Sequence, residues 1–140
     1  MLYLDASAIV KLHVREKGTE LAQAAVREAV AKRRLIATCC VSYAEVLAAF
    51  ARGVEDSGDL DNLNSAFLRA WPQYHPVFLD QTMLTEAGIL ARSHKLRGFD
   101  ALHLAAALSL RSPRKRAVFA VFDKTLAKAA ASEGFEVIGG

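Results

Sequence analysis

The chain begins with Met1-Leu2-Tyr3-Leu4-Asp5-Ala6-Ser7-Ala8-Ile9-Val10-Lys11-Leu12. Apolar residues are followed at once by an acid, a small residue and a hydroxyl, and then by an apolar run that permits a helix. This pattern is typical of a short buried strand followed directly by a helix, with Asp5 at the carboxyl end of the strand. Ligands and catalytic groups gather at that edge in open α/β sheets. The alternative is that Asp5 or Ser7 only caps the helix, since both residue types are common caps.

Beyond this stretch, short apolar strands alternate with helices. Strands are predicted at residues 2–4, 35–39, 76–79, 117–122 and 135–138, and helices at 7–14, 19–34, 42–53, 60–71, 82–94, 100–110 and 124–133. The polar residues 55–59 are predicted to form a loop. Alternation without hairpin turns implies parallel pairing, with helices on both faces of the sheet. We therefore expect one α/β domain of three layers, spanning residues 1–140.

The composition excludes several classes of protein. With 53% hydrophobic and 24% charged residues, the chain is typical of a globular protein and not of a disordered one. No apolar run approaches the roughly 20 residues that a membrane helix needs. Asp5 interrupts the N-terminus too early for a signal peptide. We expect a cytoplasmic protein that does not interact with membranes.

The cysteines and histidines do not form a recognisable metal or disulfide pattern. Cys39 and Cys40 are adjacent, and neighbouring cysteines rarely bridge each other or match the spacing of a zinc site. The four histidines are scattered, without an HExxH pairing. A zinc site and a structural disulfide are therefore both disfavoured.

Four acids stand at predicted junctions between elements, next to apolar sequence: Asp5, Glu45, Asp100 and Asp123. In a parallel sheet these junctions face one edge, so the carboxylates would converge and repel one another. Divalent cations make such a cluster tolerable, and carboxylate and water oxygens are the ligands that Mg²⁺ and Mn²⁺ prefer. One or two such ions can activate water and stabilise the in-line displacement of a phosphodiester.

Each of these acids also has a purely structural explanation. Ser42 and Glu45 have the form of a capping box, in which Glu45 would bond to the Ser42 amide. Asp100 and Asp123 could be N-caps of the helices that follow them. Independent caps would not explain why all four acids fall at the same predicted edge.

Four segments resemble the motifs of PIN-domain ribonucleases, and most closely those of VapC toxins. They are Leu4-Asp5-Ala6-Ser7-Ala8, Tyr43-Ala44-Glu45-Val46, the segment from Gly98 to Ala107, and Val121-Phe122-Asp123-Lys124-Thr125-Leu126. The resemblance implies a three-layer α/β/α fold with a five-stranded parallel sheet of order 3-2-1-4-5. It implies a Mg²⁺- or Mn²⁺-dependent endoribonuclease of a type II toxin–antitoxin pair that cleaves RNA. It also implies a homodimer and a small VapB-like antitoxin that blocks the acidic cleft.

The family's site residues can be matched position by position. Asp5, Glu45, Asp100 and Asp123 match its acidic quartet, which would ligate the metal and carry the catalysis, and Ser7 matches the hydroxyl that supports it. The chain departs from the family at Val121, where family members often carry Thr or Ser two residues before the fourth acid. A supporting hydrogen bond to Asp123 would then be missing.

The distribution of basic residues fits an RNA partner. Eighteen Lys and Arg face fifteen acids, and once the four clustered acids are set aside only eleven remain to balance them. Basic clusters lie at residues 32–34, 92–97 and 111–116, although each residue could simply be a solvated helix end. His103 follows Asp100 by three residues, and a packed or hydrogen-bonded histidine is favoured there over a catalytic base.

Other functions fit the sequence less well. Phosphohydrolases of the haloacid-dehalogenase type generally use Asp-x-Asp after the first strand, whereas Ser7 stands at the second acidic position. A receiver-like signalling domain would need an acidic pair there. The alternatives that stay open are a solitary PIN-domain ribonuclease in RNA processing and a PIN domain that binds RNA or protein without cutting.

Overall fold

A computed structural model describes the whole chain, from Met1 to Gly140. Five parallel strands form one sheet in the order β3-β2-β1-β4-β5, which confirms the predicted order. The strands are β1 Leu2–Leu4, β2 Ile36–Cys39, β3 His75–Val77, β4 Val118–Ala120 and β5 Glu136–Ile138. The first strand lies in the middle of the sheet, so Asp5 follows it at the centre of the carboxyl edge.

The register of the central strands brings two of the predicted site acids to the same edge. Leu4 of β1 is paired with Ala120 of β4. One residue further on, the amide of Asp5 donates to the carbonyl of Ala120, with an N···O distance of 3.3 Å. Asp123 lies three residues beyond Ala120 on the same side of the sheet, where the chain turns into the next helix.

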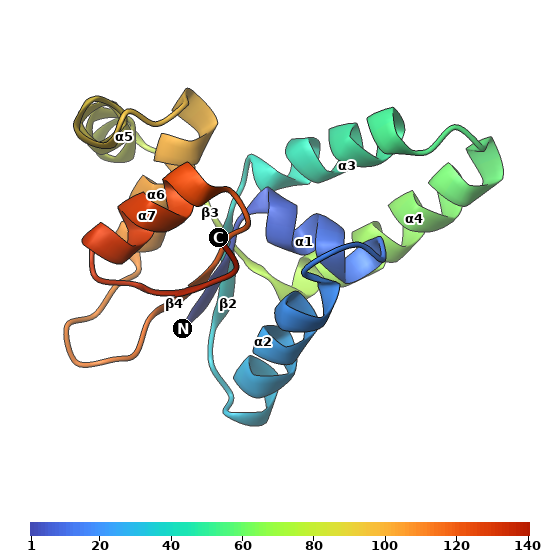
Figure 1. Cartoon of the computed structure of the whole chain (residues 1–140), viewed down its shortest axis with the longest axis horizontal. Coiled ribbons are helices and arrows are strands. Elements are labelled where there is room, and N and C mark those ends of the chain that lie inside the picture. The colour runs from blue at the N-terminus through green and yellow to red at the C-terminus, as the bar shows by residue number, and fades with distance from the viewer.

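Seven helices cover the sheet in two layers (Figure 1). One face is covered by α1 Ala6–His13, α2 Thr19–Ala31, α3 Ser42–Gly53 and α4 Ser57–Ala70, the other by α5 Gln81–His94, α6 Gly98–Ser109 and α7 Lys124–Ser132. A short 3-10 helix, η1 Trp71–Gln73, follows α4. The predicted three-layer α/β/α fold is confirmed. None of the helices combines the length and apolar character needed to cross a membrane.

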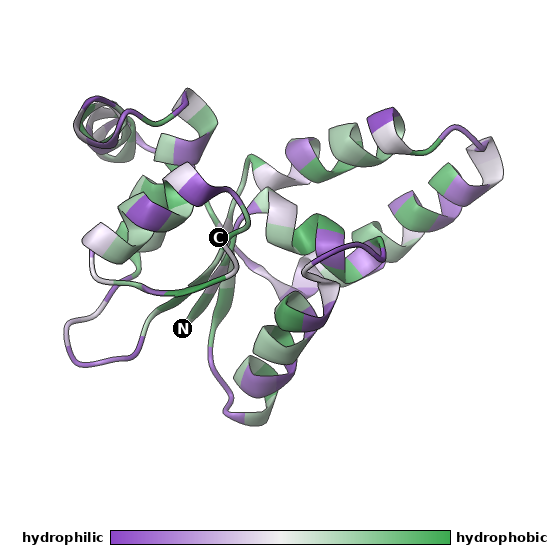
Figure 2. Cartoon of the chain, in the orientation of Figure 1, coloured by the Kyte–Doolittle hydropathy of each residue, from purple (hydrophilic) through white to green (hydrophobic).

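The two faces of the sheet have separate hydrophobic clusters. Tyr3 and Phe119 point to the cluster under α5, α6 and α7, whereas Leu2 and Leu4 point to the cluster under α1 to α4. Successive side chains of a strand point to opposite faces, which explains this division. All three residues of β1 are buried, and Figure 2 shows hydrophobic strands between helices in which hydrophobic and hydrophilic residues alternate. Continuous apolar strands of this kind are typical of a parallel sheet that is covered on both faces.

Helix boundaries differ from the predictions where a cap was misplaced. The predicted loop at 55–59 is too long: residues 55–56 lie between helices, but α4 already starts at Ser57, because Asp56 accepts a hydrogen bond from the amide of Asp59 and caps it. Helix α6 starts at Gly98, two residues before Asp100, so Asp100 is not its N-cap.

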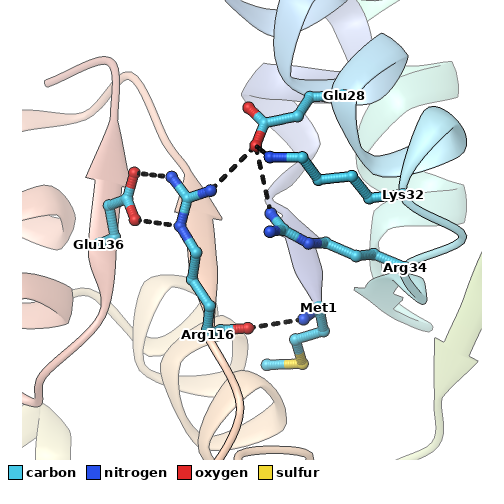
Figure 3. Close-up of polar contacts among 6 residues, drawn as sticks. All are labelled: Met1, Glu28, Lys32, Arg34, Arg116 and Glu136. Carbon is cyan, nitrogen blue, oxygen red and sulfur yellow. Dashed lines mark hydrogen bonds and ion pairs between the residues drawn. The ribbon is translucent and has the colours of Figure 1, made fainter.

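Ion pairs join the strands at the amino edge, opposite the predicted site (Figure 3). Glu28 of α2 accepts from Lys32 at 2.8 Å and from Arg116 at 2.9 Å. Arg116 also forms two hydrogen bonds to Glu136 of β5, and its carbonyl accepts from the Met1 amino group at 2.8 Å. Arg116 therefore links the starts of β1 and β5 to α2.

Candidate active site

Asp5 is the most deeply buried acid of the carboxyl edge, with 5% of its surface exposed. Its Oδ1 accepts from the amide of Ala8 at 2.8 Å, so Asp5 does cap α1. The Ser7 hydroxyl donates to the same carboxylate, with O···O distances of 2.7 and 2.9 Å to its two oxygens. Burial raises the pKa of Asp5, and the nearby His103 and these two hydrogen bonds only partly oppose the rise. Burial therefore disfavours the charged form of Asp5, and a neighbouring cation would stabilise that form.

Glu45 is held by a buried hydrogen-bond chain and not by a capping box. Its Oε1 lies 2.8 Å from Nε2 of His103, and Nδ1 of His103 lies 3.1 Å from the hydroxyl of Tyr3. Ser42 instead bonds to Thr38, with an O···O distance of 2.6 Å, so the capping-box alternative is wrong. Tyr3 is fully buried and His103 is 2% exposed. The chain connects β1, α6 and α3.

The direction of this chain follows from the chemistry of its members. A carboxylate only accepts hydrogen bonds, so Nε2 of His103 carries a proton and donates to Glu45. When Nε2 carries the only ring proton, Nδ1 is the acceptor for the Tyr3 hydroxyl. Burial raises the pKa of Tyr3 well above its ordinary value, so this hydroxyl stays protonated and can donate. His103 therefore positions Glu45, in agreement with the predicted hydrogen-bonded histidine.

Asp100 and Asp123 share one arginine. Arg97 Nε donates to Oδ2 of Asp100 at 3.1 Å, and Arg97 Nη2 lies 3.9 Å from Oδ2 of Asp123. These two carboxylates raise the pKa of Arg97, whose side chain is 81% exposed. Asp123 also accepts from the amide of Leu126 at 2.9 Å and caps α7. Asp100 caps nothing, because α6 has already begun.

Two hollows meet at Glu45. A cavity of about 690 Å³ between α5 and α6 is lined by Glu45, Arg97 and Asp100 together with apolar residues. A second hollow of about 660 Å³ is lined by Ser7, Glu45 and Arg52. The exposed ring of Phe99 lines both hollows. The acidic site therefore opens to solvent on both sides of Glu45.

The four acids are arranged as two pairs. Asp5 and Glu45 are close enough that the charge of Glu45 contributes to the raised pKa of Asp5, whereas Asp100 and Asp123 are joined through Arg97. No three His, Cys, Asp or Glu side chains lie close enough together to ligate one ion as the side chains stand. The donors are nevertheless all carboxylate oxygens, the set that suits Mg²⁺ or Mn²⁺.

Two residues of the site, Arg97 and Tyr3, were given no role in it by the sequence. Arg97 stands three residues before Asp100, a spacing that brings side chains together on a helix and could have indicated the pair. The hydroxyl of Tyr3 needs a partner because the residue lies in a buried strand, but the sequence gives no sign of which partner. Val121 is fully buried among apolar residues of the α5–α7 face, so no hydroxyl supports Asp123 from that position.

The chain matches known proteins along its whole length. The family model described as PIN domain matches residues 2–132. Ribonuclease VapC45 of Mycobacterium tuberculosis (strain CDC 1551 / Oshkosh) is 37% identical over 143 residues, covering 98% of this chain and 94% of the relative.

Two solved structures share the fold at low sequence identity. One is FitAB bound to an IR36 DNA fragment, with a TM-score of 0.72, 16% identity and coverage of 99% of this chain and 94% of that one. The other is a toxin–antitoxin complex from Klebsiella pneumoniae, with a TM-score of 0.67, 17% identity and coverage of 91% of each chain. Together with the matched family model and the VapC relative, these findings show that the chain belongs to the PIN-domain family and is of the VapC type.

Proposed function

We propose that the chain is a metal-dependent endoribonuclease, the toxin of a type II toxin–antitoxin pair. The ribonuclease activity is supported by the relative named Ribonuclease VapC45, whose length this chain nearly covers. The observation that carries the proposal is the burial of the Asp5 carboxylate at the centre of the carboxyl edge, beside Glu45, which in turn lines a cavity with Asp100. Such a buried acid is costly unless a cation compensates its charge.

The residues that would hold Mg²⁺ or Mn²⁺ are Asp5, Glu45, Asp100 and Asp123. Their oxygens fit a hard cation, and Arg97 already shows that the edge attracts positive charge. Because Arg97 is largely exposed, it can leave the two acids at little cost. The chemistry that a bound ion supplies at such a site is activation of water and stabilisation of charge on the scissile phosphate.

The other side chains hold these acids in place. Ser7 and the Ala8 amide fix both oxygens of Asp5, His103 fixes Glu45, and the Leu126 amide fixes Asp123. Groups that are oriented before the substrate arrives need no reorganisation during the reaction. The guanidinium groups of Arg97 and Arg52, which line the two hollows, are suited to bind RNA phosphates near the scissile bond.

We also propose two protein partners. A small VapB-like antitoxin would block the acidic cleft, and a second copy of the chain would form a homodimer. The toxin–antitoxin complex from Klebsiella pneumoniae has the same fold, which supports an antitoxin partner for this chain. Copurification of the product of a neighbouring small gene would test the pairing, and its failure to inhibit cleavage would favour a solitary ribonuclease.

The function is tested by incubating the purified protein with structured RNAs in Mg²⁺ or Mn²⁺, with EDTA as the control. We expect cleavage only with the added ion. We also expect it to persist when the nucleotide 5′ of the cut is 2′-deoxy, since water and not the 2′-hydroxyl attacks. Cleavage that is equal in EDTA, or that requires the 2′-hydroxyl, would contradict the proposed chemistry.

A further inference from the structure

A hydrophilic groove of about 520 Å³ lies between the end of α5 and α7, along the length of α7. Three lysines line it: Lys95 directly after α5, and Lys124 and Lys128 on α7. Lys124 and Lys128 are four residues apart, so they project from the same face of the helix, about 6 Å apart along its axis. The lining also contains hydroxyl groups, among them that of Thr125, and its only ring is the imidazole of His94.

The charge of this groove is not compensated. None of the three lysines forms an ion pair, whereas Lys11 and Lys32 elsewhere each pair with a glutamate. His94, which also lines the groove, is paired with Glu133 at 2.7 Å. A concave surface with three free ammonium groups and several hydroxyls is suited to an anion with repeated charges.

The backbone conformation at Lys95 disfavours a lysine, so the needs of the fold do not explain this residue. Lys95 has φ of 54° and ψ of 42°, the left-handed conformation that ends a helix and that glycine adopts most easily. A lysine at this position is less favourable for the backbone than glycine would be. It does, however, place an ammonium group on the rim of the groove.

The groove adjoins the acidic site. Lys124 directly follows Asp123, and Arg97, two residues after Lys95, contacts both Asp100 and Asp123. Lys124 also lines a second hollow together with Lys11 and Lys17, on the other side of Asp123. A polyanion that enters the acidic cleft therefore meets positive charge as it leaves along α7.

We propose that this α5–α7 groove binds the sugar–phosphate backbone of the RNA substrate, at nucleotides outside the scissile bond. The proposal rests on the proposed ribonuclease function and assigns the path of the RNA beyond the cleft. Because the groove offers ammonium and hydroxyl groups, and its single ring, the imidazole of His94, is held by Glu133, it contacts phosphates and not bases. The groove fixes the position of the RNA along the protein without distinguishing its bases.

The test compares two triple variants that remove the same charge. The groove variant is Lys95→Gly/Lys124→Ala/Lys128→Ala. The control is Arg33→Gly/Arg114→Ala/Lys115→Ala, whose residues are exposed, form no ion pairs and lie toward the opposite edge of the sheet. Arg33 is the other non-glycine residue with positive φ, so the control also matches the backbone change.

Binding of a fluorescent single-stranded 20-nucleotide RNA is measured in EDTA over a series of salt concentrations. Loss of three phosphate contacts makes the negative slope of log K against log salt less steep by about 2. We expect this decrease, with at least tenfold weaker binding at low salt, in the groove variant only. With Mg²⁺, the KM for the 20-mer rises while kcat/KM for a tetranucleotide, which is too short to reach the groove, stays unchanged. Thermal unfolding checks that both variants fold.

The outcomes separate this proposal from the function on which it rests. A groove variant that matches the control in salt slope and in KM would overturn the RNA path and leave the ribonuclease assignment intact. A wild-type protein that cleaves no RNA would contradict the proposed function, while the binding measurement, which needs no cleavage, would still report on the groove.

Discussion

Replacing Tyr3 with Phe removes one hydroxyl from a fully buried ring and leaves the rest of the side chain in place. The hydroxyl lies 3.1 Å from Nδ1 of His103, whose own exposure is 2%. Without it, a buried ring nitrogen loses its only partner, and such a loss costs about 1–3 kcal/mol. For a protein of this size, about 1 kcal/mol corresponds to a decrease in Tm of roughly 3–5 °C. We therefore expect Tyr3→Phe to lower Tm by roughly 3–15 °C.

The assay is thermal and urea unfolding of Tyr3→Phe beside Tyr43→Phe. Tyr43 is a matched control because it loses the same atom from a side chain that is 40% exposed and forms no hydrogen bond through its hydroxyl. We expect the control to change stability by less than about 0.5 kcal/mol. In a double-mutant cycle with His103→Leu, the Tyr3 substitution should then cost little, because its partner is already gone. Equal changes in both single variants, or full additivity in the cycle, would refute the hydrogen-bond chain.

Two further predictions concern charged residues. Arg97→Ala removes the cation that Asp100 and Asp123 share, so the affinity for Mn²⁺, measured by electron paramagnetic resonance, should rise. The increase should be at most about fivefold, because exposed ion pairs contribute at most about 1 kcal/mol. Arg92→Ala is the control, and unchanged or weaker Mn²⁺ binding to Arg97→Ala would contradict the proposed competition between Arg97 and the metal ion. Hydrogen bonds from Lys32 and Arg116 lower the pKa of Glu28, and those from Arg116 lower the pKa of Glu136. The stability that Arg116 contributes is therefore complete above the usual carboxyl pKa and is lost as the pH falls through the lowered values. The Tm difference between the wild type and Arg116→Ala should therefore be present at pH 7 and shrink toward pH 3; a difference that is the same at both pH values would contradict this account.

The strand-and-helix pattern was sufficient for much of the fold because the strands are short, apolar and free of hairpin turns. Asp5 and Asp123 could be placed at one edge on that basis, since each directly follows an apolar run that the sequence predicts to be a strand. The capping interactions of Asp56 and Asp80 were harder to see, because polar residues such as 55–59 are equally typical of a loop. The residue that starts a helix depends on which side chain reaches a free amide, and several candidates stand within a few positions.

The connections within the site could not be predicted for a different reason. The contact between Glu45 and His103 joins residues 58 positions apart, and it exists because α6 and α3 meet at the carboxyl end of the sheet. Locally, Ser42 and Glu45 have the form of a capping box, so the sequence pattern favoured the wrong partner. The contact between Arg97 and Asp123 could not be predicted for the same reason, because it depends on how α6 and α7 pack. Residue types at element ends predict a site, whereas tertiary packing decides which of them touch.

The central claim is that the acids of the carboxyl edge carry the reaction and do not merely cap helices. Asparagine caps a helix about as well as aspartate but lacks the charge, so Asp→Asn substitutions separate the two roles. Asp5 and Asp123 cap α1 and α7, and Asp56 and Asp80 cap α4 and α5 outside the cleft, which makes them controls.

The most direct measurement is the rate of Mg²⁺-dependent RNA cleavage by these four single variants, with Tm measured on each. The account predicts that Asp5→Asn and Asp123→Asn lose activity by about 100-fold or more while their Tm values stay close to wild type, and that Asp56→Asn and Asp80→Asn cleave at the wild-type rate. If Asp5→Asn cleaved RNA as fast as the two control variants, the acidic edge would not be the active site.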